Sequence, residues 1–593
     1  MSELGDHYTV VVVGSGYGAG VAASRIAATG QQVCVLERGR EMLAGDFPTG
    51  WKQGVEQAQF DAPGLDKGSK TALFDVRINK EMNVLVGCGL GGTSLINANV
   101  ALVPEPRVFD SNHWPAAVRA HRDTLLADGY ARAERMLQPN PYPEDYPRLD
   151  KLEAHEQEAK ALGRPFVRVP INVTFEDRVN AAGVPQKACV GCGNCVSGCN
   201  HWAKNTVNLN YVADAHRSGA VVFCEVTVRY VSRDGDKWRI HVQPTEGDGP
   251  ERTITADVVV LGAGSLGSTE ILLRSAAEGL PVSARLGDRF SANGDFLGFA
   301  YNTNRTINGI GIDESKQTIE AGERLAVGPT ITSAIWYPPG QPLEDDFIIE
   351  EGAIPGLMAS ADPVFLPPVF AAEALVATLQ GHNTVLSGAD PSTFDNVKTF
   401  ADLPHAVEEH GRAHGLGGLL EEAKELAEQV AREAVSAVRG SYHGAMANTQ
   451  TYLVMGHDDA GGVMELRDDK LRIDWPGSGT QPYYEKIQPA LLGATAAHKG
   501  IYVEEPTWNE LMGHNLITVH PLGGSVMAED SSSGAVDHRN RVFTGADANS
   551  VYEGLLVTCG ASIPCPLGVN PLMTICAVAE RAMTLLIEER GWG

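Results

Sequence analysis

Two polar residues near the end of the chain have the side chains and surroundings of a reaction site. His520 lies in the run TVHPLGG at residues 518–524, and Asn570 lies in GVNP at residues 568–571. An imidazole titrates near neutral pH and can take up a proton, while an amide offers a donor and an acceptor and can orient a reacting group. Each has a structural alternative: His520 as the residue that holds the turn at Pro521, and Asn570 as the N-cap of a final helix.

The elements that must position these residues begin with a βαβ unit at the other end of the chain. A buried strand at residues 10–13 is followed by GSGYGA at 14–19, a helical stretch, a second strand at 33–36 and Glu37. This pattern predicts a dinucleotide site, in which the backbone at Gly14, Gly16, Tyr17 and Gly18 approaches a pyrophosphate at the helix N-terminus. Glu37 would accept the adenosine ribose hydroxyls and repel a 2′-phosphate, which disfavours NADP.

Two further glycine-rich passages, at residues 84–99 and 256–268, again follow apolar runs. We therefore predict an α/β fold, with a Rossmann-like cofactor domain assembled from residues 1–108, 200–296 and 511–593. Residues 109–199 and 297–510 form the predicted substrate domain. Alternating stretches at 452–455 and 471–475 indicate a mainly antiparallel sheet there, and the spacing of apolar residues from 419 to 438 predicts a covering helix.

Charge and composition exclude several classes of protein. The chain has 593 residues, with 47 basic against 74 acidic side chains and a net charge of −27, which repels nucleic acid. No apolar run approaches the roughly 18 residues of a membrane-spanning helix. The glycine turn begins at Gly14, which leaves no room for a signal peptide, and the sequence predicts a cytoplasmic enzyme.

A cluster of cysteines needs its own explanation. Cys189, Cys192, Cys195 and Cys199 have the C-x₂-C-x₂-C-x₃-C spacing of a bacterial ferredoxin run. Asn200 replaces the usual proline, and in two-cluster ferredoxins the fourth cysteine of such a run serves the other cluster. Reduced thiols, a structural zinc ion and a [4Fe–4S] cluster are therefore all open.

Together these passages resemble the glucose-methanol-choline (GMC) oxidoreductases, and within them the cholesterol oxidase-like branch. The resemblance implies noncovalently bound FAD. It implies an adenosine end at Tyr17, Gly18, Glu37 and the backbone of Val226, and a flavin end beside Gly87, Thr93, Asn97, Ala98 and Gly560. Cys559 departs from the pattern, because this branch usually carries aspartate there, and a thiol is a poorer acceptor for a ribityl hydroxyl.

The resemblance also implies a reaction: hydride transfer from an alcohol to flavin N5, with His520 as base or hydrogen-bond partner and Asn570 orienting the substrate or the flavin. Glu351 lies in a segment resembling the strand that carries the isomerisation base of cholesterol oxidases, although the sequence does not decide between Glu350 and Glu351. A proline-rich apolar segment at 362–370 lines either the substrate entry or the core.

The expected substrate is a bulky apolar alcohol, such as a sterol, a terpenoid or a long-chain alcohol. Oxygen or an electron carrier is the expected acceptor. A lyase or decarboxylase on the same scaffold and an iron-sulfur flavoprotein specialised for electron transfer are the alternatives.

Overall fold

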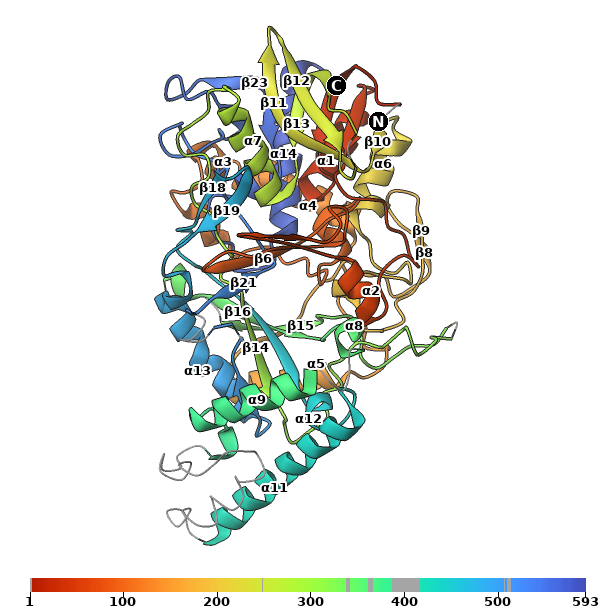
Figure 1. The fold of residues 1–593 in the computed structure, drawn as a ribbon, viewed down its shortest axis with the longest axis vertical. Coiled ribbons are helices and arrows are strands. Elements are labelled where there is room, and N and C mark those ends of the chain that lie inside the picture. Colours follow the sequence, from red (N-terminus) through yellow and green to blue (C-terminus); the bar gives the residue numbers. More distant parts are fainter. Residues whose placement is uncertain are drawn as a thin grey trace.

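In the computed structural model, residues 3–593 are described except for 248, 321, 338–341, 361–365, 387–415, 506 and 509–512, and of residues 416–423 only the course of the helix is described. The molecule is elongated, with both chain ends at one end and helix α11 (Leu416–Arg439) at the other (Figure 1). The predicted α/β fold is confirmed.

A mainly parallel sheet forms the end that carries the termini. Its parallel strands are β10 (Val221–Phe223), β2 (Val33–Leu36), β1 (His7–Val13), β13 (Arg252–Leu261) and β23 (Val551–Val557), extended by the antiparallel β12 (Lys237–Pro244), β11 (Val226–Asp234) and β22 (Arg541–Phe543). Val10 and Val12 pack into one apolar cluster and Val11 and Val13 into another. Both faces of the sheet are therefore buried, as continuous apolar strands require.

Helices from distant parts of the chain cover this sheet. They are α1 (Tyr17–Ala27), α4 (Ala127–Leu137), α6 (Tyr211–Arg217), α7 (Gly264–Ala277) and α14 (Leu572–Arg590). Helix α14 contacts α1 and α4, and α1 contacts α6. The apolar stretch at residues 222–226 does not form one continuous strand. Glu225 adopts a left-handed backbone (φ 60°) and separates β10 from β11.

The second large sheet is antiparallel throughout. Its strands run in the order β20 (Ile501–Val503), β14 (Phe296–Tyr301), β17 (Gln450–Met455), β16 (Phe347–Gly352), β15 (Ser333–Tyr337) and β7 (Phe166–Arg168). Helices α5 (Asp150–Leu162), α9 (Leu366–Leu379) and α13 (Pro482–Ala496) contact it. The predicted antiparallel sheet and the predicted helix at 419–438, now α11, are confirmed, but the stretch at 471–475 forms only a separate hairpin of β18 (Val463–Arg467) and β19 (Lys470–Asp474).

A smaller sheet connects the cofactor segment to the histidine turn. It consists of β21 (Leu516–Thr518), β6 (Met82–Gly87), β5 (Phe74–Arg77), β3 (Ala58–Ala62) and β4 (Leu65–Lys67). Strands β21 and β6 are parallel, with Thr518 opposite Val84. The chain therefore leaves β21 toward His520 and leaves β6 toward the second glycine-rich passage at the same edge of this sheet.

Shorter elements complete the chain: α2 (Trp51–Glu56), α3 (Ala116–Ala120), α8 (Gly356–Ala359), α12 (Gly444–Ala447), β8 (Arg178–Val179) and β9 (Pro185–Gln186). Part of the apolar segment at 362–370 lies outside the described residues, and its described part, including the buried Leu366 and Phe370, starts α9. No described helix is long and apolar enough to span a bilayer. The cytoplasmic location stays a prediction.

Candidate active site

The turn between β1 and α1 has the geometry of a nucleotide-binding loop. Gly14 has φ +89°, and a Cβ there would lie 2.7 Å from the carbonyl oxygen of Gly262. A Cβ on Gly18 would lie 1.7 Å from the carbonyl oxygen of Thr558, whereas one on Gly16 would meet nothing within 4 Å. The outer glycines are thus required by packing, and the backbone of Gly16 faces open space suited to a phosphate.

Glu37 follows β2 and is buried. Its carboxylate accepts hydrogen bonds from the Ser15 hydroxyl at 2.5 Å and from the Gly39 N–H at 2.7 Å. Burial raises the pKa of Glu37, while these two hydrogen bonds lower it. The N–H of Val226 donates to the Glu37 carbonyl at 2.9 Å, so these two predicted adenosine contacts are neighbours.

The predicted flavin contacts lie in the passage that follows β6. The N–H of Gly87 donates to the Thr93 hydroxyl at 3.1 Å, and the Asn97 amide donates to the Tyr17 hydroxyl at 2.8 Å. The Tyr17 side chain therefore points to the segment that ends at Ala98 and not to Glu37. The role of Tyr17 stays a prediction, but its hydroxyl lies on the flavin side of the proposed site.

His520 is paired with an aspartate that the sequence alone did not suggest. Asp295 is buried, and its Oδ1 lies 2.8 Å from His520 Nδ1. Its Oδ2 accepts from the Thr518 hydroxyl at 2.8 Å and from the Val519 N–H at 2.9 Å. Because a carboxylate can only accept, Nδ1 carries the proton of the neutral ring and Nε2 keeps its lone pair.

The loop that carries Asp295 also holds the segment before Asn570. The Asn293 amide donates to the Val569 carbonyl at 2.9 Å, and its oxygen accepts from the Leu567 N–H at 2.7 Å. Buried Asp458 in turn accepts from the backbone N–H of Gly294 at 3.0 Å. One loop thus positions both residues that the sequence singled out.

Asn570 faces a buried glutamate and does not cap a helix. Helix α14 begins at Leu572 with Pro571 as its N-cap residue, so the N-cap interpretation is wrong. The Asn570 amide instead donates to Glu350 Oε2 at 3.3 Å. Burial raises the pKa of Glu350 well above its ordinary value, and the nearby carboxylates of Glu351 and Asp295 raise it further. Burial and these carboxylates thus favour the protonated form of Glu350.

Glu351 points away from Asn570, because successive side chains of β16 lie on opposite faces. Its Oε2 forms an ion pair with Lys151 Nζ at 2.5 Å, and both side chains are fully buried. Its Oε1 accepts from the Thr332 N–H at 2.7 Å. The structure thus brings Glu350, and not the predicted Glu351, together with Asn570.

Gly560 and Cys559 lie against the histidine turn. The Gly560 carbonyl accepts from the Gly523 N–H at 2.9 Å, and a Cβ on Gly560 would lie 3.1 Å from the Pro521 carbonyl oxygen. The Cys559 sulfur lies 3.2 Å from the Ser268 hydroxyl. The thiol therefore already has a protein partner at the position where a ribityl acceptor was expected.

The residues around this site fit a bound FAD. Buried polar atoms without a hydrogen-bond partner among the described residues include Asn97 Oδ1, Thr558 Oγ1, Asn570 Oδ1 and Glu350 Oε1. Unpaired buried polar atoms are costly unless a ligand or water satisfies them. They lie on the segments predicted to contact the cofactor and the substrate, and Gly16 leaves space at the phosphate end.

The four cysteines of residues 189–199 line one pocket together with His201 and Lys204. All ten cysteines of the chain lie in described segments and are free thiols. Lys204 is buried, and its ammonium group donates to the carbonyls of Cys195 at 2.9 Å and Asn97 at 2.7 Å. This pocket is therefore connected to the segment predicted to contact the flavin.

A sheet of the dinucleotide-binding type joined to a histidine–carboxylate pair is the arrangement expected of a nucleotide-dependent oxidoreductase. Residues 11–291 match the family model of the GMC oxidoreductases. This match, which covers a little under half of the chain, and the relatives described next support an FAD-dependent oxidoreductase that acts on CH–OH groups. The predicted fold class and the predicted resemblance to the GMC oxidoreductases are confirmed.

Individual relatives agree with this assignment. A cholesterol oxidase of Mycobacterium tuberculosis is 28% identical over 606 residues, which cover 98% of this chain and 91% of that protein. A long-chain-alcohol oxidase of Arabidopsis thaliana is 26% identical over 36% of this chain and 25% of its own length. A solved fungal aryl-alcohol oxidase has a TM-score of 0.57 at 15% identity over 99% of this chain and 100% of its own, which is a likeness in fold.

Asp295 and Asn293 are the candidate site residues that the sequence does not indicate. Glu350 is the alternative that the sequence leaves open beside Glu351, since alternation within a strand leaves its phase open. Asp295 and Asn293 lie in an unremarked SANGD run, more than 200 residues from His520. Nothing in a single sequence indicates pairing over that separation.

Proposed function

We propose that this protein oxidises a bulky apolar alcohol, such as a sterol, a terpenoid or a long-chain alcohol, to the ketone or aldehyde. Oxygen or an external electron carrier would be the final acceptor. The observation that carries the proposal is the 2.8 Å pairing of His520 Nδ1 with buried Asp295, which leaves Nε2 free to accept a proton. The names of the cholesterol and long-chain-alcohol oxidase relatives support this substrate class.

FAD, when bound, supplies the acceptor for the hydride at flavin N5. Gly18, Glu37, Val226 and the backbone of Tyr17 would hold its adenosine end. Thr93, Asn97, Ala98 and Gly560 would hold its flavin end, beside which the Tyr17 hydroxyl lies. His520 takes the hydroxyl proton at Nε2, and a positioned base of this kind contributes roughly 10²- to 10⁴-fold to the rate. Asp295 stabilises the ring after it has become a cation.

Asn570 and Glu350 would orient the substrate. Asn570 Oδ1 has no partner among the described residues, so it can accept the substrate hydroxyl or another donor. Burial raises the pKa of Glu350, and its carboxylate form would take a proton from one carbon of the substrate and return it to another. For a sterol whose double bond is separated from the new ketone by one saturated carbon, we assign isomerisation into conjugation to Glu350 and not to Glu351.

The test is an anaerobic titration of the FAD-loaded protein with sterols and long-chain primary alcohols, followed by absorbance. An alcohol substrate should bleach the flavin bands, and the His520→Ala variant should keep FAD but bleach far more slowly. If no alcohol bleaches the flavin while another substrate is cleaved without net oxidation, the lyase or decarboxylase alternative replaces the proposal.

A further inference from the structure

The four thiols of residues 189–199 line one pocket, but no three of them converge as the ligands of one zinc ion would. Within the described part of the chain, the donor atoms that lie within 4.8 Å of one another belong to Cys192, His201 and Glu314, and no three of the four thiols meet that limit. A tetrahedral zinc ion with Zn–S bonds of about 2.3 Å needs sulfurs only about 3.8 Å apart. A larger centre, with several metal atoms between the sulfurs, suits this arrangement.

We propose that Cys189, Cys192, Cys195 and Cys199 bind a [4Fe–4S] cluster that carries electrons from the reduced flavin to an external one-electron acceptor. The C-x₂-C-x₂-C-x₃-C spacing is that of a cluster-binding run. The cluster site stands on the cysteine geometry, and only the source of its electrons rests on the proposed alcohol oxidation.

The backbone of the loop is shaped to turn the thiols inward. Gly191, Gly193 and Gly198 all have positive φ values, of 76°, 79° and 106°. A Cβ on Gly191 would lie 2.4 Å from the Leu325 carbonyl oxygen, and one on Gly198 would lie 2.0 Å from the Phe47 ring. The glycines between the cysteines are thus required because the loop folds tightly against its neighbours. A loop of solvent-exposed thiols would not need this packing.

The surroundings of the sulfurs favour an anionic centre. The Gly191 N–H donates to the Cys189 sulfur at 3.4 Å. Hydrogen bonds to sulfur and nearby charge tune iron-sulfur centres. The buried ammonium group of Lys204 lines the same pocket and offsets the negative charge of four thiolates.

Lys204 also connects the pocket to the flavin segment. In addition to the Cys195 carbonyl, it donates to the carbonyls of Leu95 at 3.0 Å and Asn97 at 2.7 Å. Reoxidation of one reduced flavin releases two electrons and one proton. The cluster would pass the electrons singly, cycling between its 2+ and 1+ states, to a quinone or haem carrier, and the proton would go to solvent.

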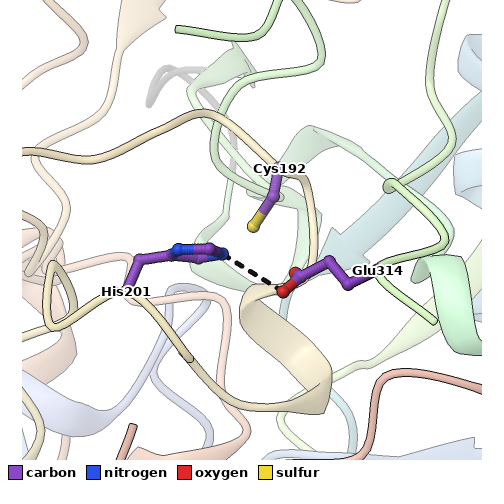
Figure 2. Close-up of side chains that lie close together, drawn as sticks. All are labelled: Cys192, His201 and Glu314. Carbon is purple, nitrogen blue, oxygen red and sulfur yellow. Dashed lines mark hydrogen bonds and ion pairs between the residues drawn. The ribbon is translucent and has the colours of Figure 1, made fainter. Parts of the chain in front are cut away.

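The competing site at this place is a single metal ion on Cys192, His201 and Glu314. Figure 2 shows the Cys192 sulfur and the His201 ring both directed toward the Glu314 carboxylate. His201 Nε2 lies 3.2 Å from Glu314 Oε2, and the Asn194 amide donates to Glu314 Oε1 at 2.8 Å. Glu314 is thus satisfied by protein donors, and this site would use only one of the four thiols.

The test is metal and sulfide analysis of the full-length protein, expressed with iron and purified without oxygen, then treated with ferrous iron and sulfide. We expect about four irons and four sulfides per chain, and an electron paramagnetic resonance signal on reduction by dithionite or by an alcohol substrate. Cys189→Ser should lose iron, sulfide and signal but keep FAD, while Glu314→Gln should keep all of them.

Different failures have different meanings. About one zinc per chain that is lost in Glu314→Gln but kept in Cys189→Ser would overturn the cluster in favour of the single-ion site. The absence of iron and sulfide after reconstitution of the wild-type protein would also overturn it, whatever the variants do. A cluster that is reduced by dithionite but by no alcohol leaves the cluster site intact, and flavin absorbance then separates two failures. If the alcohol bleaches the flavin, transfer of electrons from flavin to cluster is overturned; if no alcohol bleaches the flavin, the proposed alcohol oxidation is overturned.

Discussion

Asp295 accepts hydrogen bonds from the ring of His520, at 2.8 Å, and from the backbone N–H of the same residue, at 3.2 Å. The aspartate therefore fixes both the turn and the orientation of the imidazole. Its further contacts with Thr518 and Val519 leave it little freedom to move. The basicity of the outward ring nitrogen thus depends on a residue that itself has no need to touch the substrate.

Replacing Asp295 with Asn should slow flavin reduction by about 10²- to 10⁴-fold, because an amide no longer specifies the tautomer or stabilises the protonated ring. FAD should remain bound. Anaerobic stopped-flow absorbance measures the rate. The double variant with His520→Ala should be hardly slower than His520→Ala alone, since the two residues act as a unit; simple multiplication of the two effects would mean that Asp295 does not act through His520.

Replacing Glu350 with Gln should change how stability depends on pH. Above the ordinary pKa of 4.5 the unfolded chain releases this proton, while the folded protein, whose Glu350 pKa is raised well above 4.5, retains it. The contribution of Glu350 to folding therefore falls as pH rises toward the folded-state pKa. Urea unfolding of both proteins at pH 5 and pH 8 should show the variant gaining relative to wild type at pH 8, and an equal difference at both values would contradict this.

The same variant should separate oxidation from isomerisation. With a sterol whose double bond is separated from the new ketone by one saturated carbon, Glu350→Gln should still reduce the flavin but release the unconjugated ketone, because glutamine cannot shuttle a proton. The ultraviolet absorbance of the conjugated product measures the second step. Normal formation of the conjugated ketone would remove Glu350 from that role.

Replacing Glu351 with Gln should lower the stability of the protein but leave its catalytic activity unchanged. The change leaves the fully buried Lys151 ammonium group without its carboxylate partner, and breaking a buried pair in this way costs about 3–5 kcal/mol. The urea midpoint should fall accordingly. Adding Lys151→Met should recover part of the loss, and the absence of any recovery would argue against the unpaired charge as the cause.

Two neighbouring glycines should respond differently to alanine. Gly16→Ala meets no atom within 4 Å, so the FAD-free protein should keep its stability to within about 0.5 kcal/mol while its FAD affinity falls at least tenfold. Gly18→Ala, whose Cβ would lie 1.7 Å from the Thr558 carbonyl oxygen, should disrupt folding itself. Unchanged FAD affinity in Gly16→Ala would show that the phosphate does not lie beside this residue.

The sequence by itself determined the elements whose signals are local. Continuous apolar strands that end in glycine turns predicted the parallel sheet and the segments that build it, and the GMC motifs located His520 and Asn570. These predictions hold in the folded protein because the turn at Gly14 and the close approach at Gly18 both require a residue without a side chain. The sequence shows directly where such residues lie.

Only the tertiary structure decided which groups meet. It places Glu350, and not Glu351, beside Asn570, because the pairing of β16 within the sheet sets which face each of its residues presents. It turned Asn570 from a helix cap into the partner of Glu350, and it brought Asp295 to His520 across 225 positions of sequence. A single sequence records which residues favour a strand or a turn, but the pairing of distant side chains is set by how the elements that carry them pack in the folded chain.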